Sequence, residues 1–297
     1  MKQDTNQGAL FATLAFVWWG LTPLYFKWLG DIAPFEVLAN RIVWSFLLVS
    51  LLLWFSYKAS GLRSIFASPK QVMVMIASSA IIAVNWLTFI WSVSVDRVLE
   101  ASMGYYINPL VSVFLGMIFL KERLIPVQRV ALALAAIGVS VQVIAVGYLP
   151  WITLVLAFSF GFYGLLRKLV PTDAYTGLWF ETAMATPLAL IYLIWIDGGA
   201  AFVAPSVDGL KLALAGVVTT APLIWFAMAA RRLPLSTLGF FQYLAPTIAL
   251  LLATLVFGET LDWTKVLTFV FIWAALLLLI GHNLLQRRRQ SGALAGK

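Results

Sequence analysis

Two related stretches of sequence decide the fold. The first is Ala101-Ser-Met-Gly-Tyr-Tyr-Ile-Asn-Pro-Leu110, which continues through an apolar segment to Phe119-Leu-Lys-Glu-Arg-Leu124. The second is Ser236-Thr-Leu-Gly-Phe-Phe-Gln-Tyr-Leu-Ala-Pro246, which continues to Val256-Phe-Gly-Glu-Thr-Leu261. Each copy opens with two small residues, an apolar residue, a glycine and two aromatic residues, and each closes with Glu-x-Leu. The repetition predicts that the chain consists of two related halves.

The composition is that of a membrane protein with several spans. Of the 297 residues, 62% are hydrophobic and 11% are charged, whereas soluble domains contain roughly 45–50% and 25%. The chain has no cysteine, which excludes disulfides and thiolate chemistry. A single histidine, His282, excludes a metal site built from several histidines. No nucleotide-binding loop of the Gly-x4-Gly-Lys-Ser/Thr type occurs, and we expect neither a cofactor nor a metal.

Ten segments are long enough to cross a bilayer, which takes about 20 apolar residues. The first apolar run begins near Ala9 and contains Pro23, without the small-x-small cleavage site of a signal peptide, so we interpret it as the first span. The predicted spans are 9–29, 36–57, 71–94, 100–120, 127–147, 149–167, 177–196, 210–230, 236–257 and 263–285.

The distribution of Lys and Arg predicts the orientation. With the N-terminus inside, fifteen of the twenty basic residues lie in cytoplasmic segments and four lie on the opposite side, which leaves Arg41 within a span. This asymmetry follows the positive-inside rule and places both termini in the cytoplasm. It also accounts for the net charge of +8 without a nucleic-acid partner. We expect the basic tail, residues 286–297, to lie against anionic lipid headgroups.

The repeat extends to further spans, since Phe16-Val-Trp-Trp-Gly20 resembles Phe160-Gly-Phe-Tyr-Gly164. We therefore divide the spans into a first five-helix half, 9–147, and a second, 149–285. Because five is odd, the second half must enter the membrane from the opposite side. The predicted fold is an all-α membrane protein with ten transmembrane helices in two inverted five-helix repeats, a construction common among secondary transporters.

The chain resembles the RarD-type branch of the EamA family, within the drug/metabolite transporter superfamily. The resemblance lies in segments spread over nearly the whole chain: Trp19-Gly20, Pro23–Lys27, Arg41–Ser45, Asn85-Trp86, Glu100–Tyr105, Ile107–Leu110, Leu235–Tyr243 and Phe271–Trp273. It implies an inner-membrane permease with two EamA-type halves that exports metabolites or drugs. Proteins of this branch are linked by name to chloramphenicol sensitivity, but the resemblance does not define a substrate.

One feature departs from the superfamily, whose repeats typically close with Leu-Gly-Glu. The second copy keeps Gly258 before Glu259, whereas the first copy has Lys121 before Glu122. The sequence leaves open whether the two closing turns share a role.

Only two ionisable residues qualify clearly as lying inside the predicted spans, Arg41 in the second and Glu181 in the seventh. A charge at the bilayer centre costs at least about 2.5–3.5 kcal/mol on insertion scales, so such residues are candidates for function. They could pair across a central cavity or bind a charged group of the substrate, and Glu181 could take a coupling proton. In the alternative interpretation, each lies near a helix end and pairs locally.

Further candidates for a substrate cavity are polar and aromatic residues deep within spans, where lipid offers no hydrogen-bond partner. The fourth and ninth spans supply Tyr105, Tyr106, Asn108, Gln242 and Tyr243; the third supplies Asn85 and Trp86; and the first and sixth supply Trp19 and Tyr163. The alternative role for the polar members is hydrogen bonding between helices. Pro109 and Pro246 occupy related places in the two copies and are candidate hinges, or static kinks.

These features predict a secondary-active or facilitative carrier for small metabolites or drug-like compounds in the bacterial inner membrane. It would work by alternating access, in the export direction usual for the resembled family, with or without coupling to protons. Its expected partners are a small-molecule substrate and the lipid bilayer, and we expect a monomer or a weak homo-oligomer. Alternatives are an intramembrane lipid-modifying enzyme, which would cluster His, Asp or Glu at one membrane face, and a channel or receptor.

Overall fold

The computed structural model describes residues 2–55, 65–66, 68–95, 97–148, 150–170, 172–197, 207–258 and 262–295. Within these ranges the regular structure is helical throughout. Glu259 of the second closing segment lies outside the described residues, as do Lys58, Arg63 and Lys297 among the twenty basic residues counted above. The side chains of 286–295, which belong to the predicted basic tail, also lie outside them.

Ten stretches of the described chain are long and apolar enough to cross a membrane, which confirms the predicted number of spans. The helices are α1 Lys2–Leu29, α2 Pro34–Phe55, α4 Pro69–Ser94, α5 Val98–Phe119, α6 Pro126–Val146, α7 Trp151–Leu169, α8 Ala174–Asp197, α10 Val207–Arg232, α11 Leu235–Gln242, α12 Leu244–Leu255 and α13 Trp263–Ala295. α11 and α12 together form the ninth span, Leu235–Leu255.

The break between α6 and α7 follows from local chemistry. Gly147 ends α6 in the left-handed conformation, with φ of 83°, which glycine adopts without steric cost. Pro150 then precedes the first residue of α7. Gly147 therefore ends one helix and Pro150 precedes the next. The count of ten spans depends on this boundary.

The two prolines related by the repeat differ in their effect. α5 continues through Pro109, whereas the ninth span is interrupted at Tyr243, three residues before Pro246. Proline has no N–H, so Pro246 cannot donate to the carbonyl of Gln242, and the helix ladder is weakened at that point. Of the two hinge candidates, only Pro246 lies beside a break in its helix.

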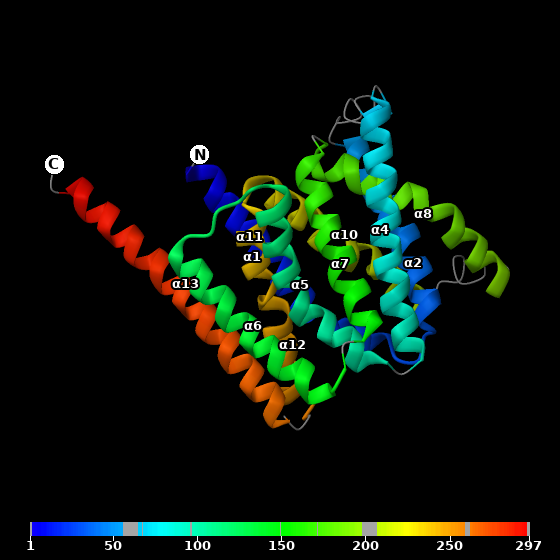
Figure 1. Ribbon diagram of the computed structural model, residues 1–297. Coiled ribbons are helices and arrows are strands. Elements are labelled where there is room, and N and C mark those ends of the chain that lie inside the picture. Colours follow the sequence, from blue (N-terminus) through cyan, green and yellow to red (C-terminus); the bar gives the residue numbers. More distant parts are fainter. Residues whose placement is uncertain are drawn as a thin grey trace.

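The two halves pack into one bundle rather than side by side as separate bodies. α1 packs against α10 and α12, α5 against α7 and α11, α2 against α8, and α6 against α13. Figure 1 shows the long α13 beside α6 at one edge of the bundle and α8 beside α2 at the opposite edge. The N- and C-terminal ends lie toward the same end of the bundle.

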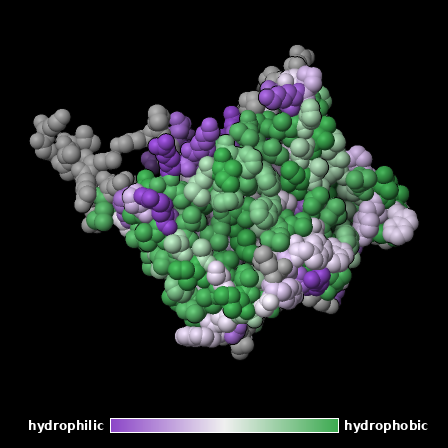
Figure 2. Space-filling model, in the orientation of Figure 1, coloured by the Kyte–Doolittle hydropathy of each residue, from purple (hydrophilic) through white to green (hydrophobic). Residues whose placement is uncertain are grey.

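The surface is suited to lipid. Green hydrophobic side chains cover the middle of the visible face, and hydrophilic side chains gather at its upper and lower margins (Figure 2). On α8, Leu188, Ile191 and Trp195 are exposed by 72%, 64% and 81%. In a bilayer these apolar side chains face acyl chains instead of water, so their exposure stabilises the membrane-embedded state.

The closing segments of the two repeat copies each contain a residue with a left-handed φ angle. Lys121 has φ of 52°, and Gly258, its counterpart, has φ of 69°. The left-handed region costs a non-glycine residue roughly 1–2 kcal/mol, yet the first copy keeps the turn with lysine. The departure from Leu-Gly-Glu noted in the sequence therefore keeps a left-handed φ angle at the residue before the glutamate.

Candidate substrate-binding site

Arg41 lies inside the bundle as the eighth residue of α2, about 10 Å along the helix from its start. Its Nε atom donates a hydrogen bond of 2.8 Å to Oγ1 of Thr219 on α10. Because α2 belongs to the first half and α10 to the second, this bond joins the two halves. It also restricts the orientation of the guanidinium group, and it leaves the two Nη nitrogens for other partners.

Aromatic side chains surround the guanidinium. Its central carbon lies 6.0 Å from the ring centroid of Phe26 on α1 and 5.8 Å from that of Trp86 on α4. Tyr25 and Tyr105 are close enough to interact with it electrostatically. Rings at about 6 Å attract a cation through their quadrupole. We call Arg41, Thr219, Phe26, Trp86, Tyr25 and Tyr105 the Arg41 site.

The Arg41 site carries a charge without a counterion. In the described part of the chain, no carboxylate forms an ion pair with Arg41. The side chain is partly exposed, and Tyr105 beside it is 48% exposed. A buried charge is costly unless it is paired or hydrated. Protein therefore does not enclose Arg41 and Tyr105 completely, and part of their surface is open to a ligand, to water or to lipid.

Glu181 has the opposite surroundings. It is the eighth residue of α8 and is 2% exposed. One carboxylate oxygen accepts a 2.7 Å hydrogen bond from the Ser78 hydroxyl, and the other accepts a 3.1 Å bond from the Tyr163 hydroxyl. Arg167, also 2% exposed, places Nη1 3.7 Å from the first oxygen. The carboxylate thus has a counterion and two donors.

The partner of Glu181 is Arg167, not Arg41. The sequence does not point to Arg167, because a basic residue at the end of a predicted span reads as a cytoplasmic anchor. The structure extends α7 to Leu169 and turns Arg167 inward against α8. Gly177 makes the room: a Cβ added there would lie 1.7 Å from Nη1 of Arg167. A small residue on one helix therefore admits the cation of the next.

An aromatic cluster made by helices of both halves fills the bundle interior. Trp19 of α1 lies 5.6 Å from Phe160 of α7 and 5.8 Å from Phe226 of α10, measured between ring centroids. Tyr163 stacks on Phe226 at 5.8 Å and 14°. Of these four rings, Tyr163 and Phe226 are fully buried. Of the predicted cavity residues, Tyr163 therefore lies in the packed core, and Trp19 is partly buried against it.

The other predicted cavity residues are divided among helix interfaces. Asn85 on α4 donates to the Leu156 carbonyl and the Ser159 hydroxyl on α7, at 3.0 and 2.8 Å. Gln242 donates to the Ser112 hydroxyl at 2.8 Å. These bonds are of the inter-helix kind. Of the predicted set, the structure brings Arg41, Trp86 and Tyr105 together at the Arg41 site, and it separately joins Tyr163 to Glu181.

The last three predicted residues lie apart from the Arg41 site. One packs against α13, and two have polar atoms without a hydrogen-bond partner among the described residues. Tyr106 packs on Phe269 of α13 at 5.5 Å. Asn108 and Tyr243 are buried, and Oδ1 of Asn108 and the hydroxyl of Tyr243 have no hydrogen-bond partner among the described residues. Neither side chain belongs to the Arg41 site.

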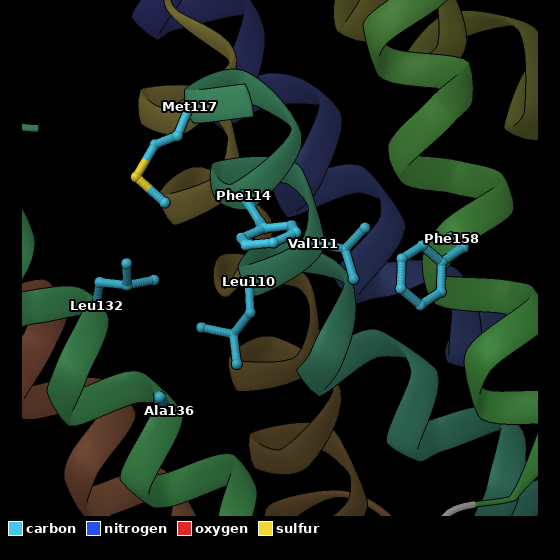
Figure 3. Close-up of a pocket in the computed structure, with 7 residues that line it drawn as sticks. All are labelled: Leu110, Val111, Phe114, Met117, Leu132, Ala136 and Phe158. Atoms are coloured by element: carbon cyan, nitrogen blue, oxygen red, sulfur yellow. The ribbon is translucent and has the colours of Figure 1, made fainter. Parts of the chain in front are cut away.

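Two surface hollows lie outside these polar groups. The one drawn in Figure 3 has a volume of about 320 Å³ and opens between α5, α6 and α7. A second, of about 370 Å³, lies between α2, α4 and α7. Every side chain lining the first hollow is apolar: Leu110, Val111, Phe114, Met117, Leu132, Ala136 and Phe158. Such a surface suits acyl chains and offers no group that would orient a polar substrate.

Metal chemistry has no visible basis in the described ranges, where no group of three His, Cys, Asp or Glu side chains is placed to hold an ion. The groups of the Arg41 site capable of recognition are hydrogen-bond donors, aromatic rings and the guanidinium of Arg41. This inventory suits reversible binding.

A comparison with protein families matches residues 6–144 and again 149–281 to the EamA-like transporter family. The chain belongs to the EamA-like transporter family. The two matches coincide closely with the two five-helix halves inferred from the repeat. As a family member with ten membrane-spanning helices, the protein is a multi-pass bacterial membrane transporter and not an enzyme.

Relatives place this EamA-family chain more narrowly. It is 47% identical over 280 residues to a Vibrio cholerae protein named "Uncharacterized transporter", covering 93% of each chain. It is 44% identical over 292 residues to Protein RarD of Escherichia coli, covering 97% of this chain and 99% of that one. It is therefore a RarD-type member. A solved structure, described as a crystal structure of a protein, matches with a TM-score of 0.67 at 19% identity, covering 91% of this chain and 96% of that one, and supports the fold alone.

Proposed function

We propose that this EamA-family transporter is a secondary carrier that exports small metabolites or drug-like compounds across the bacterial inner membrane by alternating access. The substrate would bind at the Arg41 site, and the two five-helix halves, inverted relative to each other, would rock around it. Both termini would be cytoplasmic. The observation that carries the proposal is an accessible, uncompensated guanidinium inside the bundle, held by helices of both halves.

Contacts along the helices support the inverted arrangement. A Cβ at Gly20 of α1 would lie 2.6 Å from Ile248 of α12. Two turns farther on, Lys27 lies 4.1 Å from the ring centroid of Phe257, just past α12. Contacts that advance together along both segments indicate that α1 and the ninth span run in the same direction.

The fourth and sixth spans are parallel in the same way. The Glu100 carbonyl of α5 accepts a hydrogen bond from Thr153 near the start of α7. Farther along both helices, a Cβ at Gly161 would meet Val111. The first span thus matches the ninth in direction, and the sixth matches the fourth.

The fourth and ninth spans run in opposite directions. Ser112 of α5 accepts a hydrogen bond from Gln242 at the end of α11, whereas Gly116, later in α5, faces Ser236 at the start of α11. The first and sixth spans, which correspond in the repeat, are therefore antiparallel. This is the relation that an inverted repeat requires.

The Arg41 site also has the composition expected of a carrier site. Its groups come from α1, α2, α4 and α5 of the first half and α10 of the second. A rotation of one half against the other would change the distances among them. Binding at such a place couples occupancy to the relative position of the halves. We expect a monomer or weak homo-oligomer to suffice.

The carrier mechanism is tested by counterflow in proteoliposomes. Compounds that accumulate in the medium of overexpressing cells, but not of deletion cells, would be radiolabelled and presented to vesicles preloaded with the unlabelled compound. A carrier accelerates exchange, whereas a pore or an enzyme does not. Absence of accelerated exchange with every such compound would contradict the proposal.

Coupling to protons is tested at Glu181. Glu181→Gln removes its charge and its protonation while nearly conserving its shape. If Glu181 takes the coupling proton, the variant loses the pH dependence of transport. An unchanged rate and pH profile would remove this residue from any coupling scheme, and Arg167 would then serve only to neutralise it.

A further inference from the structure

We infer that the Arg41 site recognises a small organic monoanion, a carboxylate attached to a flat apolar body, in preference to neutral or zwitterionic compounds. This inference rests on the proposed function, because it names the substrate class of the proposed site. The argument uses the charge at the site, the donors that remain, the rings around it and the groups that are missing.

The charge at the site requires an anion. Arg41 is within the membrane-spanning part of α2, and no described carboxylate pairs with it. The groups that interact with it electrostatically are Tyr25 and Tyr105, both neutral as phenols at ordinary pH. A guanidinium in a nonpolar bundle stays charged. A ligand anion therefore supplies what the protein does not.

The remaining donors match a carboxylate. Nε of Arg41 is used by Thr219, which orients the group and leaves the N–H bonds of the two Nη nitrogens. The planar fork of a guanidinium binds the two oxygens of a carboxylate through parallel hydrogen bonds. The hydroxyls of Tyr25 and Tyr105 are further donors, although Tyr25 already donates to the Lys211 carbonyl at 2.9 Å. Tyr105 is the hydroxyl better able to turn toward a ligand.

The rings define the rest of the ligand. Phe26 and Trp86 flank the guanidinium, and Phe89 packs against Tyr105 with 6.2 Å between centroids. The partly exposed faces of such rings favour an aromatic or other flat apolar body through stacking and burial of apolar surface. A strongly hydrated inorganic anion would lose its water without gaining these contacts.

The missing groups argue against a zwitterion. An amino acid would bring an ammonium group, and recognition of a buried ammonium calls for a carboxylate or several carbonyl acceptors. No acidic group of the described chain acts on Arg41. The other buried guanidinium is unsuitable, since Arg167 is 2% exposed and faces Glu181. Arg41 is the cation of this site, and a single positive charge favours a single negative charge.

The inference is tested by binding to the purified full-length protein in detergent. The probes are three matched pairs of an acid and its amide: benzoate and benzamide, phenylacetate and phenylacetamide, and indole-3-acetate and its amide. Phenylalanine and inorganic phosphate serve as zwitterionic and inorganic probes. Binding is followed by ligand-dependent thermal stabilisation and by quenching of tryptophan fluorescence.

We expect at least one acid to bind about tenfold or more tightly than its amide, the ratio expected for hydrogen bonds to a charged group. Arg41→Gln should abolish that preference, and Arg41→Lys should retain part of it. Arg129→Gln, at an exposed position of α6, is the matched control and should leave it unchanged. Equal binding of every acid and amide, binding of none, a preference for phenylalanine or phosphate, or a preference that survives Arg41→Gln would overturn the inference.

Counterflow separates this inference from the proposed function. Exchange of a neutral compound that is insensitive to Arg41→Gln would leave the carrier proposal intact and refute the anion site. Acid binding that depends on Arg41, without counterflow of that acid, would support the site and contradict the carrier.

Discussion

Arg41 and Glu181 lie in corresponding helices of the two halves, but only Glu181 has a counterion. Each is the eighth residue of its helix, α2 or α8. Arg41 donates a hydrogen bond to the Thr219 hydroxyl, and Glu181 accepts one from the Ser78 hydroxyl, in each case from a neighbouring helix. Glu181 in addition has Arg167 and Tyr163 as partners, whereas Arg41 is flanked by aromatic rings and is partly exposed.

This difference in charge compensation predicts different roles for the two positions. The Glu181 carboxylate has a counterion and two hydrogen-bond donors and is buried, so it contributes to packing and is closed to a ligand. An unpaired guanidinium with two free Nη nitrogens destabilises the empty protein but is available for recognition. We therefore expect substitutions around Glu181 to change stability and substitutions around Arg41 to change binding.

The largest expected effect is at the ion pair. Arg167→Gln leaves Glu181 buried without a counterion, and removing one partner of a buried pair costs about 3–5 kcal/mol. Thermal unfolding in detergent measures the loss. Glu181→Gln in the same chain removes the unpaired charge and should restore part of the stability. A destabilisation no larger than that of Arg41→Gln would contradict the comparison.

The two hydroxyl partners provide a matched pair of substitutions. Ser78→Ala removes a donor from a fully buried carboxylate and should cost about 1.5–3 kcal/mol, as for hydrogen bonds to charged groups. Thr219→Ala removes the acceptor of one N–H of a partly exposed guanidinium that keeps its other donors, so the cost should be clearly smaller. Equal losses in chemical or thermal unfolding would show that both sites are equally dry.

Gly177 tests whether the room for Arg167 is essential. In Gly177→Ala the new Cβ would lie 1.7 Å from Nη1 of Arg167, so the guanidinium must move away from Glu181. We expect a loss of about 1–3 kcal/mol, typical of overpacking. Gly281→Ala is the control, because nothing lies within 4 Å of its added Cβ. It should be neutral or slightly stabilising, and similar results for the two variants would exclude a special role for Gly177.

The closing turns extend the comparison of the two halves to the backbone. Lys121, with φ of 52°, bears a strain that its counterpart Gly258 avoids. Lys121→Gly should raise the free energy of unfolding by up to about 1 kcal/mol, the penalty of the left-handed region less the entropy of glycine. Gly258→Ala should lower it by a similar amount. Thermal unfolding of both variants decides, and a loss on Lys121→Gly would contradict the shared conformation.

The smallest expected effect on stability is at Arg41. Arg41→Gln removes an uncompensated charge and one hydrogen bond, whose contributions oppose each other, so the free energy of unfolding should change by less than about 1 kcal/mol. The same variant should lose the preference for organic anions. A large destabilisation without a change in binding would reverse the roles assigned to the two regions.

Much of the fold could be predicted because it depends on local sequence. Span length follows from the thickness of the bilayer, and the break at Gly147 and Pro150 follows from the backbone chemistry of two residues. The interruption at Tyr243 was not predicted, although the proline that causes it, Pro246, was identified as a hinge candidate. A proline predicts a weakened ladder, but whether the helix bends or breaks there depends on the packing around it.

The site was predicted only in part, for a physical reason. Arg41, Trp86 and Tyr105 were identified as polar or aromatic groups within spans, and the structure brings them together. Phe26 was missed, because an aromatic residue near a span end reads as an interfacial anchor. Arg167 was missed because its position at the end of a predicted span gave it the appearance of a loop charge. Neither residue has a local signal that separates the two environments.

The sequence by itself determined that this is a membrane protein with ten spans, since hydrophobic length is written along the chain, and its resemblance to the EamA family indicated a transporter. Only the tertiary structure decided which of two buried charges is neutralised. That outcome depends on Gly177 admitting Arg167 beside Glu181, while no carboxylate of the described chain reaches Arg41. Compensation of a charge is a property of neighbours in space, and neighbours in space are set by helix packing.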